Sequence, residues 1–277
     1  MVPSLVLDGK ELAVPDSSLG PNFSANHGQP VFLETLGTPF TFDGNRRFLV
    51  PHCEPIVSGS SPRYIADMFR GRTISPSYKL AGGNDAQVAQ FAIDDSLKAL
   101  VGTTGNAGTG IAADGIAISG PSLGWTNGTT NPMEILARLK FDAITNLRYF
   151  LGFTDVLPTT TFEQPFSLSV ASYTSTASDA CGILFDTAAT TDTIRAVGVA
   201  ADTDATHVDT GLAPVADTYM KVRISVLAGV MSVYLDDVLA ATVSAAITTS
   251  VALTPILVVV PTSTASRVCT VKELFAK

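Results

Sequence analysis

The stretch Tyr219–Val243, YMKVRISVLAGVMSVYLDDVLAATV, carries the clearest structural signal in the chain. From residue 221 to residue 226, basic or polar residues alternate with Val and Ile, which is the two-residue period of a strand with one buried face. Ala228-Gly229 and Asp236-Asp237 then separate this run from two further apolar runs, as turn residues do between paired strands. The stretch therefore predicts a three-stranded antiparallel meander with an aliphatic inner face and a polar outer face.

Strand-length runs of the same kind recur on both sides of this meander. Met133–Phe141 alternates most cleanly, with Ile135 and Leu139 on one face and Arg138 and Lys140 on the other. We expect roughly ten to thirteen strands between residues 78 and 277, enough for two antiparallel sheets packed face to face. Only residues 62–70 and 94–101 have a composition that allows a short helix. The other predicted strands span residues 87–93, 149–153, 182–185, 194–199, 256–260 and 268–275.

The N-terminal part of the chain has a different composition. Nine of the 16 prolines lie at or before Pro76. Each proline fixes φ and removes a backbone donor, so neither a long helix nor a central strand is expected there. The sequence therefore predicts an extended, proline-rich N-terminal arm over residues 1–76, followed by one β-sandwich over residues 77–277.

Short apolar clusters and several arginines punctuate this arm, and an extended strip has few internal contacts with which to bury them. Either the rest of the chain or a neighbouring subunit has to cover the apolar side chains. The arginines either pair with acidic groups of such a neighbour or face solvent. The predicted partner-binding residues are Val31, Phe32, Leu33, Phe40, Phe42, Arg46, Arg47, Phe48, Tyr64 and Phe69.

Composition excludes several classes of protein. With 46% apolar residues and a mean hydropathy of +0.32, the chain can bury a sizeable core and is not a disordered polymer. A net charge of −8 argues against a nucleic-acid partner held by phosphate neutralisation. No signal peptide or membrane-spanning run is recognised, so no membrane partner is expected. The three cysteines have no disulfide or zinc spacing, which indicates reduced thiols and synthesis in a cytoplasm.

Residues for catalysis are scarce. The chain has three histidines, His27, His52 and His207, and none of the common nucleophile, zinc-protease or nucleotide-binding motifs. Asp236 and Asp237 are adjacent in a predicted turn, and turn chemistry explains them better than a pair of catalytic carboxylates does. The sequence predicts no catalytic residue, and the chain is expected not to be an enzyme.

Acidic residues concentrate between residues 179 and 217, where seven aspartates accompany one arginine. Asp202, Asp204 and Asp209 could supply oxygen ligands to a hard cation such as calcium, although the glycine and the terminal glutamate of an EF-hand loop are missing. Alternatively, these aspartates accept hydrogen bonds from turn N–H groups and the loops are merely solvated. Both interpretations remain open from the sequence, and no other cofactor is expected.

Six stretches together carry a resemblance to a known fold: YFLGFTD at residues 149–155, CGILFDT at 181–187, TIRAVGV at 193–199, the Asp209-Thr-Gly211 triplet, YMKVRISV at 219–226, and VMSVYLDDVL at 230–239. They resemble the laminin-G or concanavalin-A-like jelly roll. In that fold the last stretch usually has Asp-Gly at its turn, and Asp237 replaces the glycine here. The Thr-rich and Ala-rich loops are similar to those of structural proteins of tailed bacteriophages, in particular capsid decoration (cement) proteins.

This resemblance implies a non-enzymatic viral structural protein. It would bind the exterior of a phage head, with the major capsid protein as its partner, and stabilise contacts between capsid subunits. It would act as a homo-oligomer, a trimer or a dimer, and be made in the host cytoplasm. Because jelly rolls host unrelated functions, the alternative is a tail-fibre or surface lectin-like module that binds glycans, with calcium at Asp202, Asp204 and Asp209. A glycosidase of the same fold is a third hypothesis.

Overall fold

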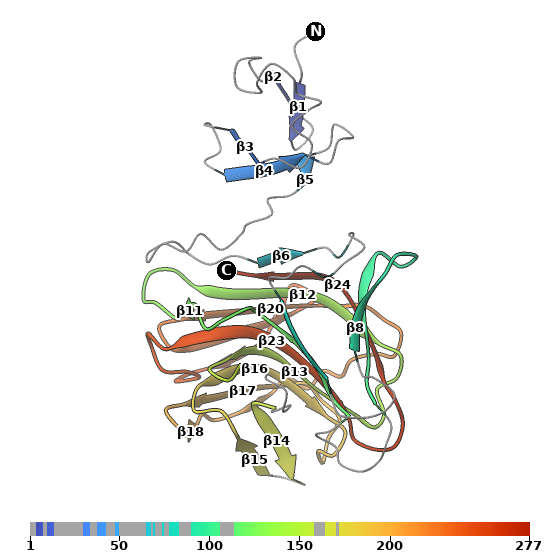
Figure 1. Ribbon diagram of the computed structural model, residues 1–277. Helices are drawn as coiled ribbons and strands as arrows, with labels where there is room; N and C mark the ends of the chain where they lie inside the picture. The colour runs from blue at the N-terminus through green and yellow to red at the C-terminus, as the bar shows by residue number, and fades with distance from the viewer. Residues whose placement is uncertain are drawn as a thin grey trace. The chain divides into compact units, whose positions relative to one another are not determined.

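Figure 1 shows the computed structural model, in which every regular element among the described residues is a β-strand. The chain divides into two compact units, residues 1–56 and 57–277. In the first unit the structure describes the backbone of five strands. In the second it describes residues 65–67, 69, 74, 78–82, 90–105, 114–157, 164–169 and 172–277, and the statements below refer to these residues.

The first unit contains paired strands rather than a wholly extended chain. One pair is antiparallel, and a separate antiparallel sheet has the order β3-β4-β5. The strands of the pair are β1 (Ser4–Leu7) and β2 (Lys10–Ala13). Those of the sheet are β3 (Pro30–Leu33), β4 (Thr38–Phe42) and β5 (Phe48–Leu49).

The second unit is a sandwich of two antiparallel sheets, which confirms the predicted fold class. The front sheet has the order β18-β17-β16-β13-β23-β10-β7, with β11 on β23 and β19 on β17. Its strands are β7 (Lys79–Gly82), β10 (Ile116–Ser119), β11 (Trp125–Thr126), β13 (Leu147–Thr154), β16 (Ala180–Asp186), β17 (Arg195–Ala200), β18 (Thr203–Asp204), β19 (Val208–Asp209) and β23 (Ala252–Pro261).

The back sheet has the order β22-β21-β20-β12-β24-β9-β8, with β6 on β24. A separate hairpin of two strands completes the described elements. Back-sheet strands are β6 (Ile65–Asp67), β8 (Gln90–Asp94), β9 (Ala99–Thr103), β12 (Met133–Phe141), β20 (Met220–Leu227), β21 (Val230–Leu235), β22 (Val238–Val243) and β24 (Val268–Ala276). The hairpin strands are β14 (Phe166–Ser169) and β15 (Ser172–Ser175).

The predicted meander is confirmed as β20, β21 and β22. Both turns use left-handed backbone: φ is +79° at Gly229, and +48° and +68° at Asp236 and Asp237. Positive φ at both central residues is the geometry that matches the twist of paired strands. Asp237 occupies a position that glycine commonly fills, and aspartate is one of the few other residues that tolerates it.

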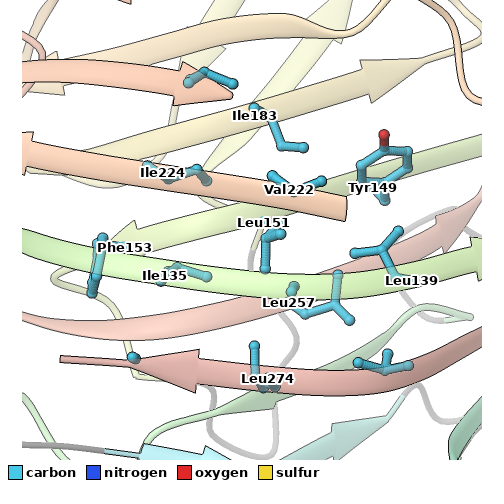
Figure 2. Close-up of a cluster of buried hydrophobic side chains, with 14 of the residues drawn as sticks. Ile135, Leu139, Tyr149, Leu151, Phe153, Ile183, Val222, Ile224, Leu257 and Leu274 are labelled. Atoms are coloured by element: carbon cyan, nitrogen blue, oxygen red, sulfur yellow. The ribbon is translucent and has the colours of Figure 1, made fainter. Parts of the chain in front are cut away.

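The main core lies between the two sheets (Figure 2). On β12 the alternation predicted from the sequence is observed, since Met133, Ile135, Ala137, Leu139 and Phe141 are all buried. Figure 2 shows side chains of both sheets in this layer. The back sheet contributes Ile135 and Leu139 of β12 and Val222 and Ile224 of β20. The front sheet contributes Leu151 of β13 and Leu257 of β23. Alternate residues from both sheets therefore fill one layer, as in other packed sandwiches.

The front sheet also has an apolar outer face. On β23, Leu257 and Val259 belong to the core between the sheets, whereas Ile256, Val258 and Val260 belong to a second cluster on the opposite face. The second cluster includes Phe166 of the hairpin β14–β15, which is fully buried. The uninterrupted apolar run on β23 thus follows from cover on both faces.

The sandwich begins earlier than residue 77, the boundary expected from the sequence. β6 pairs with β24 through Ile65↔Ala276 and Asp67↔Leu274. Phe69 is only 1% exposed and belongs to the main core. Part of the proline-rich segment is therefore built into the sheet and its core. Proline removes a backbone donor and so interrupts strands, but a short strand such as β6 can still form between two prolines and pair with β24.

Neither helix candidate is helical among the described residues. Residues 65–67 form β6, and residues 95–98 form the turn between β8 and β9. The Asp94 carboxylate accepts the N–H groups of Ser96 and Leu97 and so closes that turn. Residues 78–277 also contain more strands than expected, because two-residue strands such as β11, β18 and β19 give no periodic signal.

Gly152 and Gly182 face each other across β13 and β16. A Cβ on Gly182 would lie 2.7 Å from the Gly152 Cα and would collide with the Leu151 carbonyl oxygen. We expect Gly182→Ala to lower the free energy of unfolding by about 1–3 kcal/mol through overpacking, measured by urea denaturation. Gly128→Ala is the matched control, since its Cβ would meet no atom closer than 3.9 Å. Equal stability of the two variants would contradict the packing described here.

Phe69→Ala tests whether the segment before residue 77 belongs to the sandwich. Because the ring is buried, its loss is expected to cost about 3–5 kcal/mol of unfolding free energy, as for other buried phenylalanines. The measurement is chemical denaturation of the full chain followed by the fluorescence of Trp125. An unchanged midpoint would mean that residue 69 contributes nothing to the core.

Candidate functional site

The predicted partner-binding residues fall into three groups in the structure. Six of them lie on the sheet β3-β4-β5, where the register pairs Val31 with Phe40 and Phe42 with Phe48. Clusters that are separate in the sequence are thus neighbours in one small sheet. The other members of this group are Phe32 and Leu33 on β3. The second group, Arg46, Arg47 and Tyr64, lies outside the described residues.

The third group is Phe69 alone, and its side chain is buried rather than available to a binding partner. Its ring lies 6.0 Å from that of Tyr78, centroid to centroid, and both side chains are buried in the sandwich. Phe69 is therefore a core residue of its own chain. The sequence prediction grouped it with the arm because it lies within the proline-rich composition.

The three candidate calcium ligands do not converge. β17 pairs with β18 through Val199↔Asp204 and with β19 through Arg195↔Asp209. Four residues of a strand separate these two points, or about 13 Å, whereas oxygens around one calcium ion lie about 2.3–2.6 Å from it. Within the described part of the chain, no group of three or more His, Cys, Asp or Glu side chains is arranged to hold a metal ion.

The same aspartates have structural hydrogen bonds instead. Asp202 accepts the Ser178 hydroxyl at 2.6 Å, and Asp209 accepts the Gly211 N–H at 2.9 Å. Burial acts to raise the pKa of Asp209, but the Gly211 N–H, the Thr193 hydroxyl and the Arg195 charge outweigh it and lower the pKa. This is the turn-stabilising role that the sequence left as the alternative to calcium binding.

Other carboxylates in the sandwich are used in the same way. Asp236 accepts the Lys221 N–H, Asp142 accepts the Val268 N–H, and Asp179 accepts the Thr248 N–H, at 2.8 to 2.9 Å. Each of these bonds joins segments that are distant in the sequence. These carboxylates hold the loops of the sandwich in place.

A buried ion pair lies on the outer face of the front sheet. Arg148 of β13 and Asp186 of β16 are directly opposite each other in the register and form an ion pair. Arg148 also donates to the Gln164 side chain at 3.3 Å, next to the hairpin β14–β15. Burial raises the pKa of Asp186, and the Ala188 N–H and the Arg148 charge oppose the rise. The pair fixes the start of the hairpin over the apolar face.

His207 is the one histidine among the described residues, and it supports the same hairpin. Its ring lies edge-on to the rings of Tyr173 and Phe166, with centroids 4.6 and 6.1 Å away. Burial is the main cause that lowers the pKa of His207. The Arg195 guanidinium lies 5.5 Å from the Tyr173 ring centroid. His207 and Arg195 thus contact aromatic residues of the hairpin, Phe166 of β14 and Tyr173 of β15.

Cys181, Cys269 and Trp125 are structural. Both cysteines are free and fully buried, and burial raises the pKa of each thiol. Trp125 is only 4% exposed and pairs with Leu253 through β11, so its indole is a core anchor rather than an open platform for a sugar ring. Cys53 lies outside the described residues.

Sequence comparison finds no protein-family model and no curated protein that matches this chain. No helix among the described residues is long and apolar enough to cross a membrane.

Solved structures with a similar fold are numerous. A β-glucanase of Bacillus licheniformis aligns over 79% of this chain and 99% of its own, with a TM-score of 0.54 and 12% identity. An endo-acting O-glycanase of the human gut microbiota aligns over 76% and 97%, with a TM-score of 0.53 and 7% identity. The Emp47p carbohydrate recognition domain aligns over 78% and 95%, with a TM-score of 0.51 and 8% identity. The chain therefore has the concanavalin-A-like jelly-roll fold, and identities this low establish the fold alone.

Asp155 is a partly buried carboxyl whose surroundings make stability depend on pH. Burial raises its pKa, and the nearby charges of Asp179 and Asp202 add to the rise, against the hydrogen bond from the Asp179 N–H. A folded pKa above the unfolded one favours folding below the unfolded pKa, and that contribution is lost as the pH rises through the folded pKa. Asp155→Asn should therefore stabilise the protein at neutral pH, and the gain should vanish in acid.

The measurement is the thermal unfolding of the Asp155→Asn variant and of the unchanged protein, from acid to neutral pH. The gain should stay below about 1 kcal/mol because solvent screens a partly exposed group. Asp192→Asn, a change at an exposed aspartate, is the control and should show no comparable gain. Destabilisation of the Asp155 variant at every pH would contradict the assignment.

Proposed function

We propose that this chain is a non-enzymatic structural protein of a tailed phage, a decoration protein that binds the outside of the head. In this proposal the jelly roll is a rigid body and residues 1–56 contact the major capsid protein. The chain acts as a trimer or a dimer on the capsid exterior, after synthesis in the host cytoplasm, and engages neither nucleic acid nor a membrane.

The observation that carries the proposal is the division of the chain into a sandwich and a separate unit of 56 residues. Six residues predicted to bind a partner gather on three short strands of that unit. These strands are two to five residues long, at or below the usual strand length, and packing on another surface would stabilise so small a sheet. Several weak contacts of this kind, repeated over an oligomer, add up to tight attachment.

The use of charged groups in the sandwich supports a structural rather than an enzymatic role. The carboxylates described above hold turns, and Asp186 pairs with Arg148 within the fold. Part of the outer face of the front sheet is covered by the chain's own hairpin, where the Phe166 and Phe150 rings are tilted to each other with centroids 5.5 Å apart. These groups serve the fold of the sandwich itself.

A glycan-binding module of a tail fibre or virus surface is the second candidate. The fold likeness to the Emp47p carbohydrate recognition domain favours it, together with that to the endo-acting O-glycanase. In this alternative the sandwich, and not residues 1–56, recognises the ligand.

Shell binding separates the two candidates. Shells of the encoding phage, prepared without this protein, are incubated with the full chain and with a chain lacking residues 1–56, and bound protein is measured after sedimentation. We expect the full chain to bind and the shortened chain to lose binding. The deletion ends at residue 56 because a longer one would remove β6 and Phe69 from the sandwich.

Circular dichroism of the shortened chain is the control for folding. Shell binding that survives the deletion would overturn the role given to residues 1–56. Absence of shell binding by the full chain, combined with retention on a glycan array, would favour the second candidate.

A further inference from the structure

The outer face of three adjacent back-sheet strands has the opposite charge to the rest of the chain. β20, β12 and β24 are neighbours in the sheet, and their inward residues are buried in the main core. These strands hold five of the 17 basic residues and only two of the 25 acidic ones. The basic residues are Arg138, Lys140, Lys221, Arg223 and Lys272. A protein with a net charge of −8 thus has a locally basic sheet face.

Three of these cations surround one aromatic ring. Tyr219 directly precedes β20, and its ring centroid lies 5.2 Å from Arg138 Cζ, 5.6 Å from Lys140 Nζ and 6.0 Å from Lys272 Nζ. Each contact is favourable by itself, since the face of an aromatic ring attracts a cation. Three cations around one ring nevertheless repel each other, and a bound anion would relieve that repulsion.

A β-bulge places the third cation. The register runs Arg138↔Glu273 and then Leu139↔Val271, so Lys272 is the extra residue. Bulges redirect a side chain and are common beside functional sites. Here the bulge leaves both Lys272 and Glu273 partly exposed. Lys272 then donates to the Leu97 carbonyl and remains close to Tyr219.

The basic face has three ion pairs of its own. Arg223 pairs with Glu134 of β12 at 3.7 Å, and the Glu134 side chain is 22% exposed. The other two pairs involve more exposed aspartates. Lys140 pairs with Asp217 at 3.2 Å, and the Asp217 side chain is 73% exposed. Lys221 pairs with Asp237 at 2.8 Å in the same exposed manner. Among the described residues, neither Arg138 nor Lys272 has an ion-pair partner within 4.0 Å. Exposed pairs contribute little stability, so an external anion can replace them at small cost.

We propose that this basic face, defined by Arg138, Lys140, Lys221, Arg223, Lys272 and Tyr219, binds an acidic polysaccharide with carboxylate groups along its chain. Outward positions recur about 6.6 Å apart along a strand and about 4.8 Å apart between strands, which gives the cations a regular spacing. A polymer with an acid group on each repeat has a matching regularity, unlike the irregular carboxylates of a folded protein.

Nucleic acid fits this face less well. Base recognition on a sheet uses open aromatic faces. The second tyrosine of this face, Tyr234, has the Arg223 guanidinium 3.6 Å from its ring centroid, so that ring is already covered. A double helix has one phosphate charge per about 1.7 Å of its axis, so the chain's net negative charge repels it more than it repels a polysaccharide with one charge per sugar.

The test uses the full chain with polygalacturonate, alginate and hyaluronate, measured by calorimetry at low and high salt. We expect binding to at least one of these polymers, weakened by salt. Fully methyl-esterified polygalacturonate, which has the same backbone without charge, should not bind. Arg138→Gln combined with Lys272→Gln should weaken binding about tenfold or more. The matched control is Lys79→Gln, on the edge strand β7 of the front sheet, and it should leave affinity unchanged.

Unchanged melting temperatures of all variants show that the fold is intact. No binding to any of the three acidic polymers, equal binding to the methyl ester, or equal loss in the Lys79 variant would each overturn the inference. Tighter binding of a single-stranded oligonucleotide would overturn it in favour of nucleic acid. This inference concerns the sandwich and needs neither residues 1–56 nor a capsid, so failure here and failure of shell binding are separate results.

Discussion

The front sheet is apolar on both faces, and this constraint determines the arrangement of the rest of the sandwich. β13, β16 and β23 place alternate residues in two separate clusters, so both faces need to be removed from water. The back sheet covers one face. The hairpin β14–β15, with Phe166 against Phe150, covers part of the other (Figure 1).

Several polar groups of the sandwich hold the hairpin against the outer face of the front sheet. Arg148, paired with Asp186, donates to Gln164 beside the hairpin, and His207 packs against Tyr173 of the hairpin. A charge pair removed from water is retained only when its partners are satisfied. The hairpin and its supporting residues cover part of the outer face of the front sheet. More outward side chains are therefore open to another molecule on the back sheet. That sheet is therefore the more suitable one for recognising another molecule.

Local patterns were enough to predict the meander β20–β22 and strand β12, because alternation and turn residues lie within a few positions of each other. β6 was missed because its partner β24 lies about 200 residues away in the chain. The burial of Phe69 was missed because proline composition dominated the signal of that segment. The sequence left calcium binding and turn stabilisation open for a related reason: proximity in sequence between Asp204 and Asp209 did not reveal that they pair with distant points of β17. The basic face was visible only as alternation on single strands, until the register placed Arg138 beside Lys221.

The central strands of both sheets are made last. β23 lies between β13 and β10, and β24 lies between β12 and β9, yet both strands come after residue 251. On the ribosome, the earlier strands emerge without the neighbours that join the halves of each sheet. The sandwich can close only when translation has passed β24, and until then unpaired edges are exposed to other chains. Closure of the sandwich therefore waits for β24, and until then holding the nascent chain apart from its copies matters as much as the final contacts.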